Sequence, residues 1–286
     1  MKILTDFNEL CAVVLLAINR KLLYKLQYFH QRGRFPNLKN PRDISERILS
    51  EMLKPSFVKK YADYADKIKV RQYVKDKGLE GILLKHYGVW DDVNKIDFKK
   101  LPDKFVLKTN NGGGGHIFCR DKSTLDIKKS IKQINKTLQL PFSINSEPHY
   151  KAINPLIFCE ELIITESYDF PIDYKFTCIN GKPIDIFVGT ERGKKTKYCT
   201  FDMDWNLLDY IKKQYLPNTP PEKPKNLKKM IEIAKILSDG FTFVRVDLYD
   251  TGNNIWFGEL TFTPWGGIMY GYTDEAIKIM GSFYDN

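Results

Sequence analysis

The stretch FTFVRVDLYDTGNNIWFGELTFTPWGG, residues 241–267, reads as two strands joined by a turn. Side chains alternate between the two faces of a strand, so the valines and leucine of the first strand predict a core face, while Arg245 and Asp247 share the opposite face. On the return strand Glu259 and Thr261 also share a face. Oxygen ligands grouped in this way suit Mg²⁺, which binds through one or two carboxylates plus substrate phosphates. An ordinary surface hairpin with a cross-strand ion pair is the other interpretation.

A second stretch, FVLKTNNGGGGHIF at residues 105–118, combines a short apolar strand, one lysine and a run of glycines. Each glycine loses much backbone entropy on folding, so the run predicts a main chain that closes over a ligand. Lys108 offers a point charge and the loop a row of unhindered N–H groups, which together suit phosphate. A slack hairpin loop is the alternative. The glycines expected at this tip are Gly112, Gly113, Gly114 and Gly115.

Other nucleotide signatures do not fit the chain. The pattern GxGxxG fails because residue 117 is isoleucine, and GxxxxGK[ST] does not occur. The lysine–glycine loop and the carboxylate hairpin, weighed jointly, therefore predict an ATP site with Mg²⁺.

Length, composition and charge limit the classes of protein to which the chain can belong. A chain of 286 residues with 43% apolar residues can bury a large core. Its net charge of +10 predicts attraction to anions, which include nucleotides, acidic glycans and anionic lipids. Nucleic-acid binding is disfavoured because the cations are scattered instead of forming an aromatic-laced stripe. The five cysteines are widely spaced without a CxxC pair, which favours reduced thiols in the cytosol.

The N-terminal region predicts a helix over residues 9–30 with a cationic face. Its apolar run, residues 11–18, is far shorter than the roughly 20 residues that span a bilayer, and no cleavage site precedes the basic stretch. We therefore expect a cytoplasmic protein. The helix either packs on its own protein or makes a peripheral contact with the inner face of a membrane or with a biosynthetic enzyme.

The remaining chain alternates helix and strand signals. Asn40 and Pro41 predict the N-cap and first residue of a helix, and Asn180-Gly181 predicts a hairpin turn. Asp173 and Lys175 share one face of the strand before that turn. The expected helices are 44–52, 65–78, 123–139 and 227–240, and the expected strands are 155–162, 173–179 and 184–188.

These motifs, taken in order, resemble the ATP-grasp enzymes, and most closely the TupA-like branch found in bacterial polysaccharide loci. The resemblance covers roughly residues 35–275. It implies an α+β fold in which two subdomains clamp ATP, preceded by a mostly helical region. The implied boundaries are 1–60 for the helical N-terminal region, 61–103 for a first helical segment, 104–159 for the glycine-loop lid and 160–286 for the C-terminal subdomain. The motifs are ADK (65–67), FVLK (105–108), EEL (160–162), DYK (173–175), RVD (245–247) and ELT (259–261) followed by Thr263-Pro264.

The resemblance also assigns nucleotide-binding roles. Lys67 and Lys108 would hold the phosphates of ATP under the glycine loop, and Asp173 would reach the ribose. Taken alone, Lys67 is most simply a solvated lysine on a helix. The hinge whose backbone meets the adenine would consist of Glu160, Glu161, Leu162 and Ile163.

For the chemistry, the resemblance implies that Asp247, Glu259 and Thr261 carry magnesium. Arg245 and Lys175 would act on the transferred phosphoryl group, with Lys197 and Arg192 as weaker candidates. The family usually has asparagine as the third metal ligand, and the hydroxyl of Thr261 is a weaker one. The N-terminal region also lacks the βαβ signals of the substrate domain that many members carry.

The implied reaction is carboxylate activation by ATP and Mg²⁺, followed by attack of an amine or amino acid on the acylphosphate to give an amide. The carboxylate would belong to a glycan or sugar acceptor, such as a uronic acid of a capsule, O-antigen or wall polysaccharide. Three alternatives stay open: a kinase-like glycan phosphotransferase, a glycosyltransferase and a non-enzymatic binding module.

Overall fold

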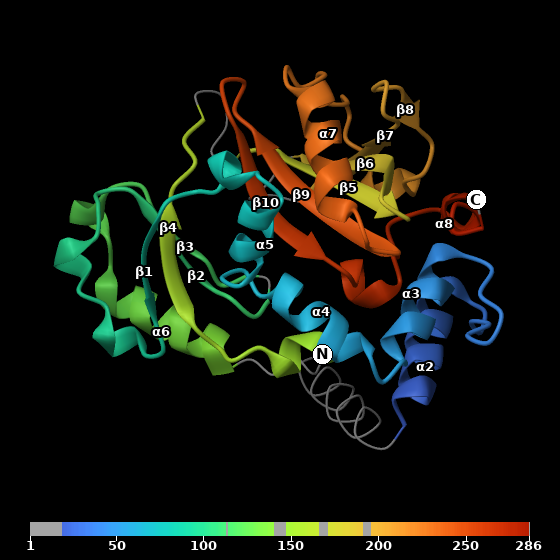
Figure 1. The fold of residues 1–286 in the computed structure, drawn as a ribbon, viewed down its shortest axis with the longest axis horizontal. Coiled ribbons are helices and arrows are strands. Elements are labelled where there is room, and N and C mark those ends of the chain that lie inside the picture. The colour runs from blue at the N-terminus through green and yellow to red at the C-terminus, as the bar shows by residue number, and fades with distance from the viewer. Residues whose placement is uncertain (1–18, 113, 140–146, 166–170, 191–195, 286) are drawn as a thin grey trace.

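Two antiparallel sheets organise residues 19–112, 114–139, 147–165, 171–190 and 196–285, which this computed structural model describes (Figure 1). The smaller sheet has the order β1-β4-β2-β3 and the larger one the order β10-β9-β5-β6-β7-β8. The strands of the smaller sheet are β1 (His86–Trp90), β2 (Phe105–Thr109), β3 (Ile117–Cys119) and β4 (Ile157–Glu161). Those of the larger sheet are β5 (Asp173–Ile179), β6 (Lys182–Thr190), β7 (Lys197–Phe201), β8 (Leu207–Leu208), β9 (Phe243–Asp250) and β10 (Ile255–Thr261).

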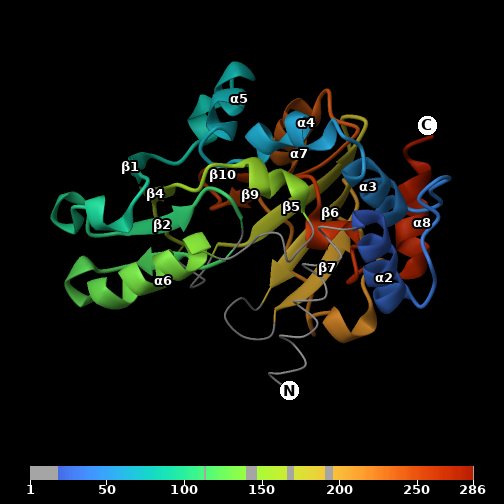
Figure 2. The ribbon, with the colours of Figure 1, turned by 90° about the horizontal axis from the view of Figure 1, so that it is seen from below.

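Each sheet has its own helix, and the other helices lie between the sheets or beside the larger one. Helix α6 packs against the smaller sheet and α7 against the larger one, as Figures 1 and 2 show from two directions. The α-helices are α2 (Arg20–Arg32), α3 (Ile44–Met52), α4 (Phe57–Ala65), α5 (Val70–Asp76), α6 (Ile127–Gln139), α7 (Leu227–Ser238) and α8 (Asp274–Ser282). The 3₁₀ helices are η1 (Glu80–Ile82), η2 (Val93–Lys95), η3 (Phe98–Lys100), η4 (Lys122–Thr124), η6 (Pro148–Ala152), η7 (Lys213–Tyr215) and η8 (Pro264–Gly267).

The smaller sheet separates an apolar face from a charged one. Phe105 and Leu107 of β2 are fully buried in a core that also holds Ile134 of α6. Because side chains alternate along a strand, Lys108 of β2 and Glu160 of β4 lie on the opposite face. The glycines connect β2 to β3, which confirms the expected hairpin.

The larger sheet repeats this division. Val244 and Val246 of β9 are fully buried in the same core as Met230 and Ala234 of α7. The other face of β9 carries the charged side chains. The turn between β5 and β6 has positive φ at Asn180 (50°) and Gly181 (75°), as expected from this dipeptide.

Hydrogen bonds to a buried carboxylate connect the N-terminal helices α2 and α3. Asp43, fully buried, accepts hydrogen bonds from Tyr28 at 2.6 Å and Arg34 at 2.5 Å. Asp43 also caps α3 by accepting from the backbone N–H of Glu46 at 2.9 Å. The N-cap prediction at Asn40 is therefore wrong, because the aspartate nearer the helix satisfies its free N–H groups.

The expected helix over residues 65–78 is interrupted. Helix α4 ends at Ala65 and α5 begins at Val70. Between them Asp66 accepts hydrogen bonds from the N–H groups of Ile68 (2.8 Å) and Lys69 (3.2 Å), which ties down a turn. Lys67 therefore lies in a bend between two helices, and its placement on a helix was wrong.

The cysteines and the expected N-terminal helix can be compared with the structure. Cys119, Cys159, Cys178 and Cys199 are buried free thiols, while Cys11 lies outside the described residues. Of the helices in the described part of the chain, none is long and apolar enough to cross a membrane. The helix expected over residues 9–30 is seen as α2 from residue 20, and residues 9–18 lie outside the described ranges.

Candidate functional site

Arg245 is the centre of a charged cluster on the open face of the larger sheet. Its guanidinium donates to both carboxylate oxygens of Asp247, at 2.7 and 2.8 Å. It also reaches Glu259 at 3.3 Å and the hydroxyl of Thr261 at 3.1 Å. Thr261 in turn donates to Glu259 at 3.0 Å. The face expected from the alternation in β9 and β10 is confirmed.

Lys175 extends the cluster to the neighbouring strand β5. Its ammonium group forms ion pairs with Asp247 and, at 3.2 Å, with Asp173. Both carboxylates are almost fully buried. Asp247 therefore receives two cations from different strands.

Lys67 links this cluster to the glycine loop. Its ammonium group donates to the carbonyl of Gly112 at 2.7 Å and forms an ion pair with Glu259 at 3.0 Å. The backbone N–H of Lys67 also bonds to the carbonyl of Asn110 at 3.1 Å. With only 10% of its side chain exposed, Lys67 is not the solvated helix lysine that its local sequence indicates.

Lys108 lies on the smaller sheet and forms an ion pair with Glu160, the first residue of the expected hinge. His86 of β1 is 3.8 Å from the other oxygen of Glu160, and burial lowers the pKa of His86 to about 4. The imidazole is therefore neutral at pH 7, and Lys108 is the cation that forms an ion pair with Glu160.

The charged side chains of the cluster shift one another's pKa values. Burial disfavours the charged form of Glu259, but Lys67, Arg245 and Lys175 outweigh it and hold the pKa of that carboxyl well below its usual range. Burial likewise opposes the charge on Arg245, and Asp247 and Glu259 raise the pKa of its guanidinium. Both the Glu259 carboxylate and the Arg245 guanidinium are therefore charged at pH values near neutrality.

The glycine loop uses backbone conformations that favour glycine. Gly114 and Gly115 have φ angles of 89° and 67°, and Gly113 lies outside the described residues. A Cβ atom on Gly115 would lie 2.0 Å from the hydroxyl oxygen of Thr137 in α6. Glycine at 115 is therefore needed for close packing as well as for its φ angle.

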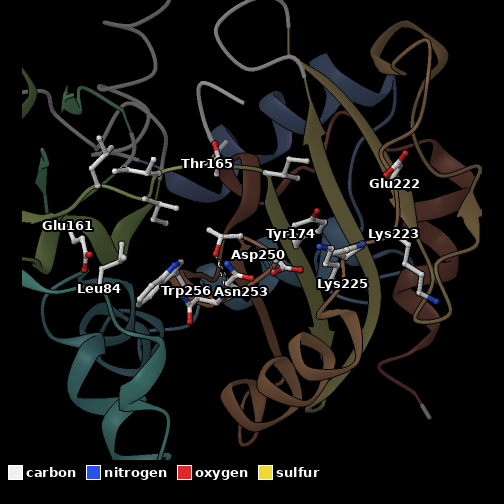
Figure 3. Close-up of a pocket in the computed structure, with 18 residues that line it drawn as sticks. Leu84, Glu161, Thr165, Tyr174, Glu222, Lys223, Lys225, Asp250, Asn253 and Trp256 are labelled. Carbon is white, nitrogen blue, oxygen red and sulfur yellow. Dashed lines mark hydrogen bonds between the residues drawn. The ribbon is translucent and has the colours of Figure 1, made fainter. Parts of the chain in front are cut away.

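A cavity of about 640 Å³ opens beside the expected hinge (Figure 3). Glu161, Leu162 and Ile163 of the hinge line it, together with Thr165, two residues beyond the hinge. Its other walls come from β5, β10, the β9–β10 turn and the segment before α7, including Tyr174, Trp256, Asn253 and Lys225, which Figure 3 labels. The cavity adjoins the end of β5 at which Asp173 lies.

Two weaker candidates stand apart from the cluster. Lys197 lies on β7, which β5 and β6 separate from β9, and its ammonium group donates to the carbonyl of Gln214 at 3.1 Å. Arg192 lies outside the described residues. The structure thus joins Lys197 to none of the charged residues above.

Glu147 is a neighbour of the cluster that sequence reasoning missed. Thr263, two residues beyond β10, donates its hydroxyl hydrogen bond to Glu147. The two residues are 116 positions apart, and no motif or spacing connects them. The only local signal was a glutamate directly before Pro148.

The donor set fits Mg²⁺ bound together with phosphate. The described residues hold no group of three His, Cys, Asp or Glu side chains arranged for a metal ion. Mg²⁺ is normally held by one or two carboxylates plus phosphate oxygens and water, so Asp247 and Glu259 suffice for such a site. Their oxygens now contact cations, which a metal and phosphates would displace.

Comparison with known proteins identifies the family. A family model described as TupA-like ATPgrasp matches residues 45–284. A search among curated proteins finds no match.

Solved structures with a similar fold include D-alanine–D-alanine ligase from Helicobacter pylori, with 15% identity, a TM-score of 0.42, and coverage of 78% of this chain and 60% of that chain. The ATP-grasp ligase PsnB, complexed with a precursor variant, Mg and ADP, matches with 13% identity, a TM-score of 0.41, and coverage of 79% and 57%. N5-carboxyaminoimidazole synthase from Aspergillus clavatus matches with 10% identity, a TM-score of 0.44, and coverage of 71% and 46%.

The chain thus spans less than two thirds of the length of these structures. The family model confirms the α+β ATP-grasp fold expected from the motifs. Because the family model covers most of the sequence, the chain belongs to the TupA-like ATP-grasp family.

Proposed function

We propose that this protein is an ATP- and Mg²⁺-dependent ligase that joins a carboxylate to an amine. The observation that carries the proposal is the charged cluster on β5, β9 and β10 together with Lys67 from the bend between α4 and α5. In this cluster Lys67, Lys175 and Arg245 pair with carboxylates that are buried or half-buried. ATP-grasp ligases need cations for phosphate and carboxylates for metal in one place. The cluster supplies both, next to a glycine loop.

The chemistry follows from these groups. The substrate carboxylate attacks the γ-phosphorus, an O–P bond forms, and ADP leaves with the electrons of the broken P–O bond. The amine then attacks the acyl carbon, a C–N bond forms, and phosphate leaves. Lys67 and Lys108 hold the phosphates, while Arg245 and Lys175 stabilise charge on the transferred group. Mg²⁺, held by Asp247 and Glu259 with Thr261 beside them, would neutralise phosphate oxygens.

The nucleoside end of ATP belongs at the hinge. We place the adenine in the cavity of about 640 Å³, against the main chain of Glu160 to Ile163, with Asp173 toward the ribose. The hinge runs along the cavity, where its main chain would meet the edge of the base, and the cavity supplies apolar walls from Leu162 and Trp256. In this placement the triphosphate runs from Asp173 toward Asp247 and Glu259.

For the substrates, we propose an amino acid or other amine and a uronic-acid carboxylate of a bacterial surface polysaccharide precursor, joined in the cytoplasm. Two properties support this class. The family is TupA-like, and the net charge of +10 favours an anionic acceptor.

The outer face of α2 supports a peripheral contact with an anionic membrane. Leu22, Leu26 and Phe29 are each at least 40% exposed, and Lys21 is exposed beside them. We expect the protein to sediment with vesicles that contain phosphatidylglycerol and not with pure phosphatidylcholine, and Leu26→Glu to abolish this. If the protein sediments equally with both kinds of vesicle, or with neither, the proposed contact with an anionic membrane is wrong. Binding of α2 to a partner enzyme would then be the explanation to test.

The ligase proposal is tested by nucleotide binding and then by turnover. ATP with Mg²⁺ should raise the melting temperature of the wild type, while Lys108→Ala and Glu259→Ala should respond weakly. Glucuronate and amino acids should then support ADP release that depends on both substrates. Stabilisation by UDP-sugars alone would point to a glycosyltransferase, and phosphate transferred to the sugar without an amine would point to a kinase.

A further inference from the structure

Glu147 reaches the edge of the charged cluster from a separate segment of the chain. It directly precedes η6, which packs against α4. Its carboxylate accepts the hydrogen bond from Thr263, whose side chain is almost fully buried. Arg245, Glu259 and Lys67 lie close enough to perturb its ionisation.

Glu147 differs from the other carboxylates of the site in its partners. Asp247, Asp173, Glu259 and Glu160 each form an ion pair with a lysine or arginine of the site. Within the described ranges, Glu147 forms a hydrogen bond with the Thr263 hydroxyl and no ion pair. No cation of the described residues therefore pairs with it directly, although Arg245 and Lys67 lie close enough to lower its pKa.

A carboxylate–amine ligase requires a group of this kind. The amine reaches the enzyme as an ammonium ion, and the carboxylates of the cluster that could attract it are already paired with cations. The ion must be held by an anion near the acyl group, and it must lose a proton before its nitrogen can attack. The metal-binding carboxylates are unsuited because they already carry cations.

We propose that Glu147 binds the ammonium group of the amine substrate and accepts its first proton. This inference rests on the proposed ligase function. One N–H bond of the ammonium breaks and its proton moves to a carboxylate oxygen of Glu147. The freed lone pair forms the C–N bond as the C–O bond to phosphate breaks. The second proton of the nitrogen leaves with the phosphate, and Glu147 later releases its proton to water.

The electrostatic surroundings of Glu147 agree with this role. Burial raises the pKa of its carboxyl to about 7; the Thr263 hydrogen bond opposes this rise, the charge of Glu259 adds to it, and Arg245 and Lys67 also oppose it. Among the described residues, the phenols of Tyr24 on α2 and Tyr150 on η6 are the other titratable groups on which the charge of Glu147 acts. A proton acceptor whose pKa is near the working pH is well matched to general base catalysis.

The test compares Glu147→Gln with Glu232→Gln, a matched substitution at an exposed position on α7. Glutamine keeps an oxygen for the Thr263 hydroxyl but has no charge. With ATP, Mg²⁺ and glucuronate, ADP release is measured with L-alanine, L-glutamate and L-lysine. Hydroxylamine, which is largely uncharged near neutral pH, serves as the amine that needs no deprotonation before it attacks.

In Glu147→Gln we expect kcat/KM for the amino acids to fall roughly 10- to 100-fold, as for loss of a charged hydrogen bond, and its rise with pH near 7 to disappear. Hydroxamate formation and the melting-temperature shift with ATP and Mg²⁺ should match the wild type. Unchanged amino-acid kinetics, or an equal loss with hydroxylamine, would overturn the assignment.

A separate arm covers failure of the ligase proposal. If the wild type turns over none of these amines, amino acids are titrated by calorimetry into the protein saturated with ADP and Mg²⁺. Heat that is present in wild type and absent in Glu147→Gln supports the ammonium site. Equal heats in both proteins, or none in wild type, would overturn it.

Discussion

Replacing Asp247 by asparagine removes one charge from the centre of the cluster while keeping the size of the side chain. Asp247 has a side chain that is 2% exposed, and it pairs with Arg245 through two hydrogen bonds and with Lys175. The substitution leaves both cations partly buried with one fewer counter-charge. Its effect on folding is therefore a direct measure of how tightly the cluster is coupled.

The magnitude follows from the partners that remain. Removing one member of a buried ion pair typically costs about 3–5 kcal/mol. Arg245 keeps Glu259 at 3.3 Å, and Lys175 keeps Asp173 at 3.2 Å, so we expect the lower end of that range. A loss of about 3 kcal/mol corresponds to a fall of roughly 1 M in the urea midpoint for a slope near 3 kcal/mol/M.

The assay is urea unfolding of wild type, Asp247→Asn, Arg245→Met and the double variant, with Asp239→Asn as a control at an exposed ion pair. The double variant should cost less than the sum of the single ones, because the two residues share one interaction. Saturation with ATP and Mg²⁺ at about 100 times Kd should add roughly 2.7 kcal/mol to the wild type and nothing to Asp247→Asn. A cost below about 1 kcal/mol, as for a surface pair, or full stabilisation of the variant by ATP would refute the reasoning.

Three further predictions test separate parts of the structure. Both ring nitrogens of His149 are buried without a hydrogen-bond partner in the described chain, and burial lowers its pKa to about 3. Protonation therefore favours the unfolded chain below pH 6.5, so His149→Phe should move the acid-unfolding midpoint to lower pH, and an unchanged midpoint would contradict this. Gly115→Ala should cost more than about 1 kcal/mol by urea unfolding, and more than Gly114→Ala, because only at 115 does the new methyl group meet Thr137. Lys108→Met should raise the calorimetric Kd for ATP with Mg²⁺ roughly 10- to 100-fold, and an unchanged Kd would remove this residue from the phosphate site.

The sequence was most informative where one strand or hairpin contains the whole pattern. Arg245 and Asp247 are two positions apart, and the period of a strand puts them on one face without further knowledge. Glu259 and Thr261 follow the same rule on the return strand. The glycine run was readable for a similar reason, because its hairpin is local and both of its strands are short and apolar.

Lys67 shows where local reasoning failed. A helix-like pattern continues across Asp66, and nothing in the period marks a break. The break is stabilised by a distant residue, since the side chain of Asn110 donates to Asp66 at 3.0 Å and its carbonyl accepts from the N–H of Lys67. A contact between residues 44 positions apart thus decides that Lys67 points into the site and not into water.

The charged cluster also explains why composition alone says little about such a site. Three cations and three carboxylates, from Lys67, Asp173, Lys175, Arg245, Asp247 and Glu259, neutralise one another with no ligand present. The same residue types would form a structural ion-pair network, because burial demands partners whether or not a ligand comes. In the proposed function the charged groups would exchange partners: phosphate oxygens would replace the carboxylates around the cations, and Mg²⁺ would be held by the carboxylates in place of those cations. Because these charges are already desolvated and paired, the proposed binding of ATP would avoid most of the cost of stripping water from isolated charges.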